Sequence, residues 1–109
     1  MAPLQVSVTE TKRRLDAAEI ALLDCREPGE HAIAAIAGAT LIPMNTIPAN
    51  LQAIEAMTDS ADLVVYCHHG VRSLNVVNWL RQQGIPNVQS MEGGIDAWSV
   101  LIDPAVARY

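Results

Sequence analysis

A cysteine at the end of an apolar strand is the feature that most constrains how this chain can fold. Residues 63–66 carry β-branched and aromatic side chains and predict a buried strand, which stops at Cys67. From Ser73 the apolar spacing predicts an amphipathic helix over residues 73–83, and Gly84 ends it. A tight loop between a strand and a helix turns backbone N–H groups inward, near the positive end of the helix dipole. Such a pocket favours a thiolate, so we expect a sulfur nucleophile there.

Short apolar runs alternate with helical patterns along the rest of the chain. This alternation predicts an α/β domain with a central, mostly parallel sheet flanked by helices. Ligands bind beyond the carboxyl ends of the strands in such sheets, and both Asp24 and Cys67 close an expected strand at that edge. The expected strands are residues 20–24, 40–42, 63–66 and one from Val88, and the expected helices are a first one behind a capping box at residues 7–10, then residues 30–36, 48–57, 73–83 and 95–101.

Composition predicts one domain with an ordinary hydrophobic core. Half of the 109 residues are hydrophobic, and a chain of this size buries roughly two-thirds of the surface that it exposes when unfolded. A net charge of −5 with scattered basic residues argues against nucleic acid or an anionic membrane as partner. Two cysteines, no visible secretory signal and no run near the roughly 20 residues of a membrane span predict a cytoplasmic location. We expect a domain over residues 1–109, with its core at about 6–98 and a short irregular tail at 103–109.

Three residues beside Cys67 decide between a nucleophile and a buried structural cysteine. Gly70 lets the loop adopt a positive φ or approach a ligand closely. Arg72 supplies a permanent positive charge, and Ser73 suits the N-cap of the helix. Position alone leaves the two interpretations about even, because free cysteines are often simply buried. The three residues together favour a nucleophile.

Three stretches of the sequence resemble the motifs of rhodanese-type sulfurtransferases. Residues 67–72 are similar to the active-site loop C-x-x-G-x-R of that family. Residues 92–98 are similar to its C-terminal motif G-G-x-x-x-W. Three motifs in the right order, over about residues 6–98, are more specific than any one of them. The N-terminal motif D-V-R-x-x-x-E and the I-x-G-A that follows it are matched by residues 23–27 with Glu30, Ile36, Gly38 and Ala39.

The resemblance implies a rhodanese-like single domain that acts as a sulfurtransferase of the thiosulfate:cyanide type. In that family the cysteine takes a sulfane sulfur from thiosulfate, or from a small-molecule or protein persulfide, and passes it to a thiol or cyanide. Cys67 is then catalytic, Arg72 attracts anionic donors, and Asp24 and Arg26 line or brace the cleft. No metal or organic cofactor is implied. The backbone that cradles the persulfide, as an oxyanion hole holds oxygen, is that of His68, His69, Gly70, Val71, Arg72 and Ser73.

The sequence departs from the family pattern near the expected nucleophile. Cys25 stands where the family usually has valine, and we interpret it as a buried valine substitute, with a disulfide-forming thiol as the alternative. His68 and His69 either tune Cys67, donate to substrate or face solvent. Metal binding by these histidines with Cys67 is disfavoured, because adjacent positions on a tight loop seldom converge on one ion. Arg72 is the only permanent positive charge of the loop, which weakens the case for thiosulfate, a dianion, as the main donor.

Three other functions stay open at this point. A cysteine-dependent phosphatase is disfavoured because its loop follows C-x5-R, whereas Cys67 and Arg72 are separated by four residues and enclose a smaller pocket. A non-catalytic regulatory domain of the same fold is disfavoured because Cys67, Gly70 and Arg72 occur together. The third is a redox sensor that uses Cys25 and Cys67.

Overall fold

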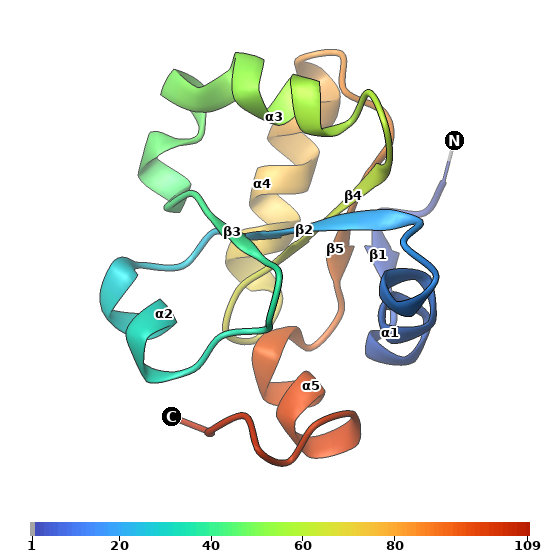
Figure 1. Ribbon diagram of the computed structural model, residues 1–109. Helices are drawn as coiled ribbons and strands as arrows, with labels where there is room; N and C mark the ends of the chain where they lie inside the picture. The colour runs from blue at the N-terminus through green and yellow to red at the C-terminus, as the bar shows by residue number, and fades with distance from the viewer. Residues whose placement is uncertain (1) are drawn as a thin grey trace.

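Five parallel strands form the centre of the computed structural model, which describes residues 2–109 (Figure 1). The order of the strands across the sheet is β1-β5-β4-β2-β3, and each neighbouring pair runs parallel. The predicted α/β class is thereby confirmed. The strands are β1 (Gln5–Val6), β2 (Ile20–Asp24), β3 (Thr40–Leu41), β4 (Asp62–Tyr66) and β5 (Val88–Met91).

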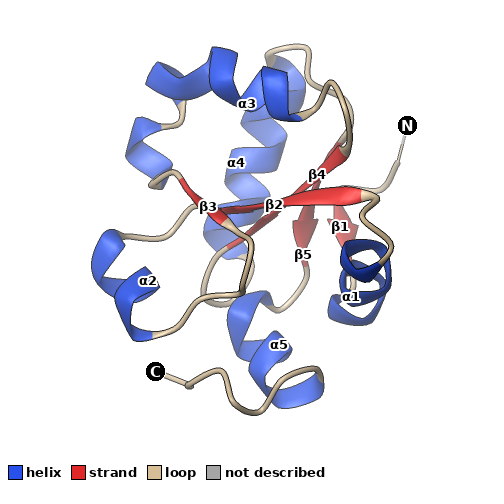
Figure 2. Cartoon of the chain, in the orientation of Figure 1, coloured by secondary structure: helices blue, strands red, loops and turns tan. Residues whose placement is uncertain are grey.

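Helices cover both faces of this sheet (Figure 2). In the view of Figure 1, α3 and α4 lie above the sheet and α1 and α5 lie below it. The helices are α1 (Val8–Asp16), α2 (Pro28–Ile33), α3 (Leu51–Met57), α4 (Val71–Gln82) and α5 (Gly94–Leu101), with two 3-10 turns, η1 (Met44–Thr46) and η2 (Pro48–Asn50), before α3.

The alternation of side chains along β2 and β4 builds two separate apolar layers. Leu23 and Val65 pack with α3 and α4 on one face, in the same cluster as Cys25 and Cys67. Leu22, Val64 and Tyr66 point to the other face, where they meet Ile95 and Trp98 of α5. Successive residues of a strand face opposite sides. The central strands, buried on both faces, therefore read as continuous apolar runs.

The start of α4 differs from the sequence prediction. The helix begins at Val71 rather than at Ser73, with Gly70 as its N-cap at a φ of 103°. The prediction that Ser73 caps the helix is therefore wrong, since Ser73 lies inside the first turn and is fully buried. A glycine adopts this left-handed backbone without a steric penalty, so the loop can turn directly into the helix.

The predicted helix over residues 30–36 is also displaced toward the N-terminus. It runs from Pro28 to Ile33, because Pro28 suits the first helical position and the Glu27 backbone N–H donates to the Glu30 carboxylate at 3.1 Å. Ala34 adopts extended backbone and ends the helix. The predicted helix 48–57 starts as the η2 turn and becomes α-helical at Leu51.

The N-terminal elements combine a confirmed prediction with two differences. Ser7 caps α1 by accepting from the Glu10 N–H at 3.0 Å, as predicted. The Glu10 carboxylate pairs with Arg13 instead of returning to the cap. The two-residue strand β1 was not predicted, because a segment this short shows no alternation to detect.

Among residues 2–109, no helix combines the length and the apolar character that a membrane crossing needs.

Candidate active site

Cys67 lies at the carboxyl edge of the sheet, directly after β4. Strands β2 and β4 pair in register, with Asp24 opposite Tyr66, so the residues after these two partners are also neighbours. The Cys25 N–H donates to the Tyr66 carbonyl at 3.1 Å and continues the ladder by one step. The predicted meeting of Asp24 and Cys67 at one edge is therefore what the structure shows. Both residues are buried, Cys67 with 1% of its surface exposed.

Three groups of the following loop and helix approach the Cys67 sulfur. The backbone N–H of Gly70 donates to Sγ at 3.1 Å, and that of Ser73 donates at 3.4 Å. The Ser73 hydroxyl lies 3.4 Å from Sγ, and it is held by Ser90 of β5 at 2.7 Å between the two hydroxyl oxygens. Such donors stabilise a sulfur anion more than a neutral thiol.

The first turn of α5 holds the loop in this conformation. The backbone N–H groups of Ile95 and Asp96 donate to the carbonyls of Cys67 and His68, at 2.9 and 3.1 Å. A Cβ at Gly94 would lie 2.4 Å from the His68 carbonyl oxygen, so only glycine allows this approach. Because α5 binds the loop carbonyls from outside, the loop N–H groups are left to face the sulfur.

The two cysteines of the chain lie together and ionise differently. The neighbouring Cys25 thiol lowers the pKa of Cys67, and the Ser73 and Gly70 donors add to this effect against the opposing effect of burial. The same contact, together with burial, raises the pKa of Cys25. The two pKa values therefore shift in opposite directions, which favours a thiolate at Cys67 beside a neutral thiol at Cys25.

Arg72 is paired with Glu30, which changes the role expected from the sequence. The Arg72 guanidinium contacts both Glu30 carboxylate oxygens, at 2.7 and 2.9 Å. This contact lowers the pKa of Glu30 to about 2 and raises the pKa of Arg72. The sequence predicts an unpaired Arg72 charge at the pocket, whereas in the structure this charge is largely balanced by a carboxylate from α2.

Asp24 and Arg26 form a buried brace between the end of β2 and α2 rather than a lining of a cleft. Both side chains are fully buried, and Arg26 donates to the two Asp24 oxygens through Nε at 2.8 Å and Nη2 at 2.7 Å. Arg26 also donates to the Ala34 carbonyl at 2.6 Å, and the Asp24 carboxylate contacts Nδ1 of His31 at 2.9 Å. Of the two expectations, lining or bracing, the contacts fit bracing.

His68 and His69 lie on the outer side of the loop. Their rings stack on each other at 3.9 Å between centroids, His68 is partly buried and His69 is exposed. The ring of Tyr109 stacks on the other side of His68, also at 3.9 Å. Among residues 2–109, no cluster of three or more His, Cys, Asp or Glu side chains is arranged to hold a metal ion.

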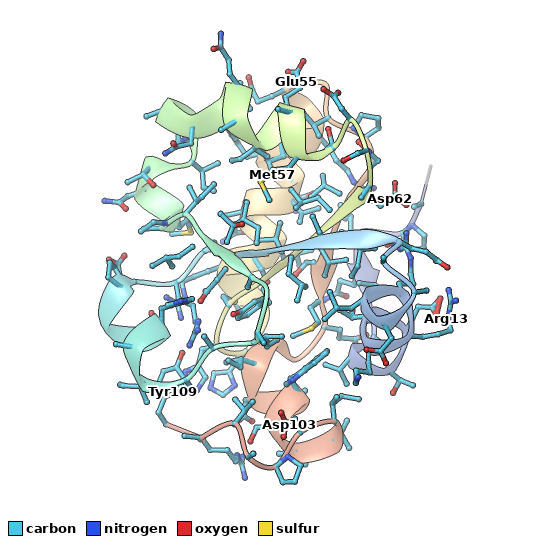
Figure 3. The ribbon with its side chains drawn as sticks, in the orientation of Figure 1. Arg13, Glu55, Met57, Asp62, Asp103 and Tyr109 are labelled. Carbon is cyan, nitrogen blue, oxygen red and sulfur yellow. The ribbon has the colours of Figure 1, made fainter. Side chains whose placement is uncertain are left out.

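Tyr109 and Ser90 are site residues that the sequence reasoning missed. The irregular tail returns past α5 to place Tyr109 beside α2 (Figure 3), where its hydroxyl contacts Arg26 and Glu30, each at 2.7 Å. Ser90 has a fully buried hydroxyl in β5, between Gln89 and the buried Met91. A small polar residue next to a buried apolar one is the one signal that could have indicated it, and the tail offered none.

Comparison with known proteins identifies relatives over most of the chain. Residues 7–101 match the family described as rhodanese-like domain. A protein of Allochromatium vinosum named sulfurtransferase is 36% identical over 97 residues, which cover 89% of this chain and 88% of the relative. The Arabidopsis thaliana rhodanese-like/PpiC domain-containing protein 12 is 36% identical over 92 residues, but the match spans only 31% of that longer protein and 84% of this chain. The human single-domain sulfurtransferase TSTD1 superposes with a TM-score of 0.79 at 25% identity, covering 92% of this chain and 98% of the human one.

Proposed function

This chain belongs to the rhodanese-like domain family, and on that premise we propose that it is a sulfurtransferase in which Cys67 carries sulfane sulfur as a persulfide. The observation that carries the proposal is the set of donors around one buried sulfur. Sγ of Cys67 accepts N–H groups from Gly70 and Ser73, next to the Ser73 hydroxyl. These donors favour the thiolate, which is the form of cysteine that attacks sulfur.

The first half of the reaction loads sulfur onto Cys67. The Cys67 thiolate attacks the outer sulfur of thiosulfate, a new S–S bond forms, and the old S–S bond breaks to release sulfite with its electron pair. A small-molecule or protein persulfide serves as donor in the same way and leaves as its thiolate. The product is a Cys67 persulfide whose terminal sulfur carries negative charge at neutral pH.

Backbone N–H groups are positioned to hold that terminal sulfur. Val71 and Arg72 lie in the first turn of α4, where a helix provides no partner for their N–H groups. The carbonyls of Cys67 and His68 accept hydrogen bonds from α5, so these two dipoles are engaged outside the pocket. The cradle over residues 68–73 therefore acts on the persulfide as an oxyanion hole acts on oxygen.

The second half of the reaction returns Cys67 to its thiolate. An acceptor thiolate or cyanide attacks the terminal sulfur and leaves with it, as a persulfide or as thiocyanate. Because the pocket lowers the pKa of Cys67, its thiolate is a good leaving group. Neither half needs a metal or an organic cofactor.

The pairing of Arg72 bears on the choice of donor. Glu30 balances the Arg72 charge, so the pocket attracts a dianion such as thiosulfate only weakly. A low-molecular-weight or protein persulfide, which carries less charge, is then the better donor.

Sulfur transfer by two cysteine variants tests this proposal. We would load the protein with thiosulfate or with a small-molecule persulfide, then measure thiocyanate after adding cyanide and a new persulfide after adding a thiol. Cys67→Ser should abolish both products, because serine is a poor nucleophile of similar size. Cys25→Ser is the matched control and should still release product. Activity retained by Cys67→Ser would refute the assignment, and turnover of an aryl phosphate by the unaltered protein would favour the phosphatase alternative.

A further inference from the structure

The second cysteine of the chain is placed where a disulfide partner of Cys67 has to be. Cys25 follows β2 as Cys67 follows β4, one step beyond the paired residues Asp24 and Tyr66. Adjacent strands lie about 4.8 Å apart, and the Cα atoms of a disulfide usually lie roughly 4.4–6.8 Å apart. The backbone spacing of this pair therefore suits a disulfide without moving either strand.

The side chains of the two cysteines also point the same way. Cys25 and Cys67 belong to the apolar cluster that faces α3 and α4, together with Leu23 and Val65 two residues earlier on the same strands. Both thiols are 1% exposed and reduced in this structure. The two thiols are close enough for each to shift the pKa of the other.

The surroundings give the two sulfurs different chemistry. Sγ of Cys67 receives the donors of the loop, so it is the anion that an electrophile meets first. Among residues 2–109, no such donor approaches the Cys25 sulfur, and its apolar surroundings keep it a neutral thiol. A reactive thiolate beside a second thiol is the arrangement of a sulfur that is oxidised and then resolved.

We propose that Cys25 is the resolving thiol of Cys67, and that peroxide converts the pair to a reversible disulfide. The Cys67 thiolate attacks one oxygen of hydrogen peroxide, the O–O bond breaks, and hydroxide leaves, so that Cys67 becomes a sulfenic acid. Cys25 then attacks that sulfur, an S–S bond forms, and the sulfenic hydroxyl leaves as water with the thiol proton. A dithiol reduces the bond by exchange and restores both thiols.

The disulfide has two consequences for the chemistry at this site. It stops the oxidation of Cys67 before the sulfinic and sulfonic acids, which dithiols do not reduce. It also occupies Sγ, so Cys67 has no free thiolate while the pair is oxidised. The inference does not depend on sulfur transfer, since it follows from the placement of the two sulfurs and the chemistry of peroxide.

The sequence makes the disulfide simple to detect. Trypsin cleaves after Arg14, Arg26 and Arg72, so Cys25 falls in the peptide 15–26 and Cys67 in the peptide 27–72. Reduced protein would be treated with hydrogen peroxide in several-fold molar excess, blocked with an alkylating agent, and measured by intact mass and by a non-reducing digest. Cys25→Val and Cys25→Ser would be treated in parallel, after thermal melts select those that fold.

The expected result is an intact monomer that has lost two hydrogen atoms, with the peptides 15–26 and 27–72 joined and separated again by a dithiol. In the Cys25 variants, the same dose of peroxide should add two or three oxygen atoms to Cys67. Three results would overturn the inference: sulfinic acid on Cys67 at the same rate with and without Cys25, a disulfide between two molecules, or no oxidation of Cys67. Because the readout is mass, it remains informative even if the protein transfers no sulfur.

Discussion

Neutralising Asp24 should cost this protein a large part of its stability. Asp24→Asn keeps the shape of the side chain but leaves the Arg26 guanidinium without a counter-ion at a site where both side chains are 0% exposed. Arg26 donates to Asp24 through Nε, Nη2 and its backbone N–H, at 2.8, 2.7 and 3.0 Å. Removing one partner of a buried ion pair costs about 3–5 kcal/mol. An amide oxygen still accepts one of these bonds, so we expect about 3 kcal/mol.

That loss is large relative to the stability of a domain of this size. The free energy of unfolding of such domains is about 5–15 kcal/mol. For a chain of this length, each kcal/mol lost lowers Tm by roughly 4 °C. Urea unfolding at pH 7 should therefore show a much lower midpoint at an unchanged m-value, with Tm lower by about 12 °C.

An exposed ion pair of the same chemistry provides the matched control. Asp16 pairs with Lys12 on α1 at 2.7 Å, and the two side chains are 60% and 45% exposed. Asp16→Asn should change the free energy of unfolding by less than about 0.5 kcal/mol, because water already screens this pair. A loss below about 1 kcal/mol for Asp24→Asn at pH 7, or equal losses for the two variants, would refute the reasoning about burial.

The pH dependence gives a second test of the same pair. Burial raises the pKa of Asp24, but hydrogen bonds from Arg26 and His31 outweigh it and the net pKa is lowered. A carboxyl group with a lowered pKa in the folded state stabilises the protein above its unfolded pKa. The contribution is lost as pH falls through the folded value. The difference between the unaltered protein and Asp24→Asn should therefore be constant near neutral pH and shrink in acid.

The other predictions concern the loop and its charges. Ser73→Ala removes a hydroxyl donor, so the alkylation rate of Cys67 should follow a pH profile displaced upward by up to about one unit; an unchanged profile would mean that the hydroxyl does not stabilise the thiolate. Gly94→Ala should lower Tm more than Gly84→Ala and should slow the alkylation of Cys67. Both glycines have a positive φ, but only a Cβ at Gly94 meets the loop carbonyls. Equal effects of the two substitutions would show that backbone strain alone is responsible. Glu30→Gln frees the Arg72 charge and should raise kcat/KM for thiosulfate roughly threefold relative to an uncharged persulfide donor. Equal changes of kcat/KM for both donors would show that the Arg72 charge does not select donors.

Local pattern was sufficient to predict most of the fold and the position of the candidate site. Apolar runs in the sequence predict the strands β2 and β4. The parallel α/β arrangement then brings the ends of these strands, with Asp24 and Cys67, to one edge of the sheet. The sequence also predicts that Gly70 allows a positive φ in the loop. The structure confirms this with a φ of 103° at Gly70.

What the sequence did not reveal depends on contacts between distant segments. Arg72 meets Glu30 across 42 residues, and the tail brings Tyr109 to Arg26 across 83. Neither partner can be deduced from spacing, because each contact exists only after the helices and the tail have packed. The place of Ser73 depends on such a contact too, because it lies inside α4 with its side chain turned inward to Ser90, which only the folded sheet places beside it.

The most direct test of the account is the intact mass of the reduced protein after incubation with a sulfane sulfur donor. We expect a gain of one sulfur atom on Cys67, larger with a small-molecule persulfide than with thiosulfate, and removed by cyanide. Cys67→Ser should gain none, while Cys25→Ser should still gain one. No added sulfur with either donor, or a sulfur that stays on the protein in Cys67→Ser, would contradict the claim that Cys67 is the persulfide carrier.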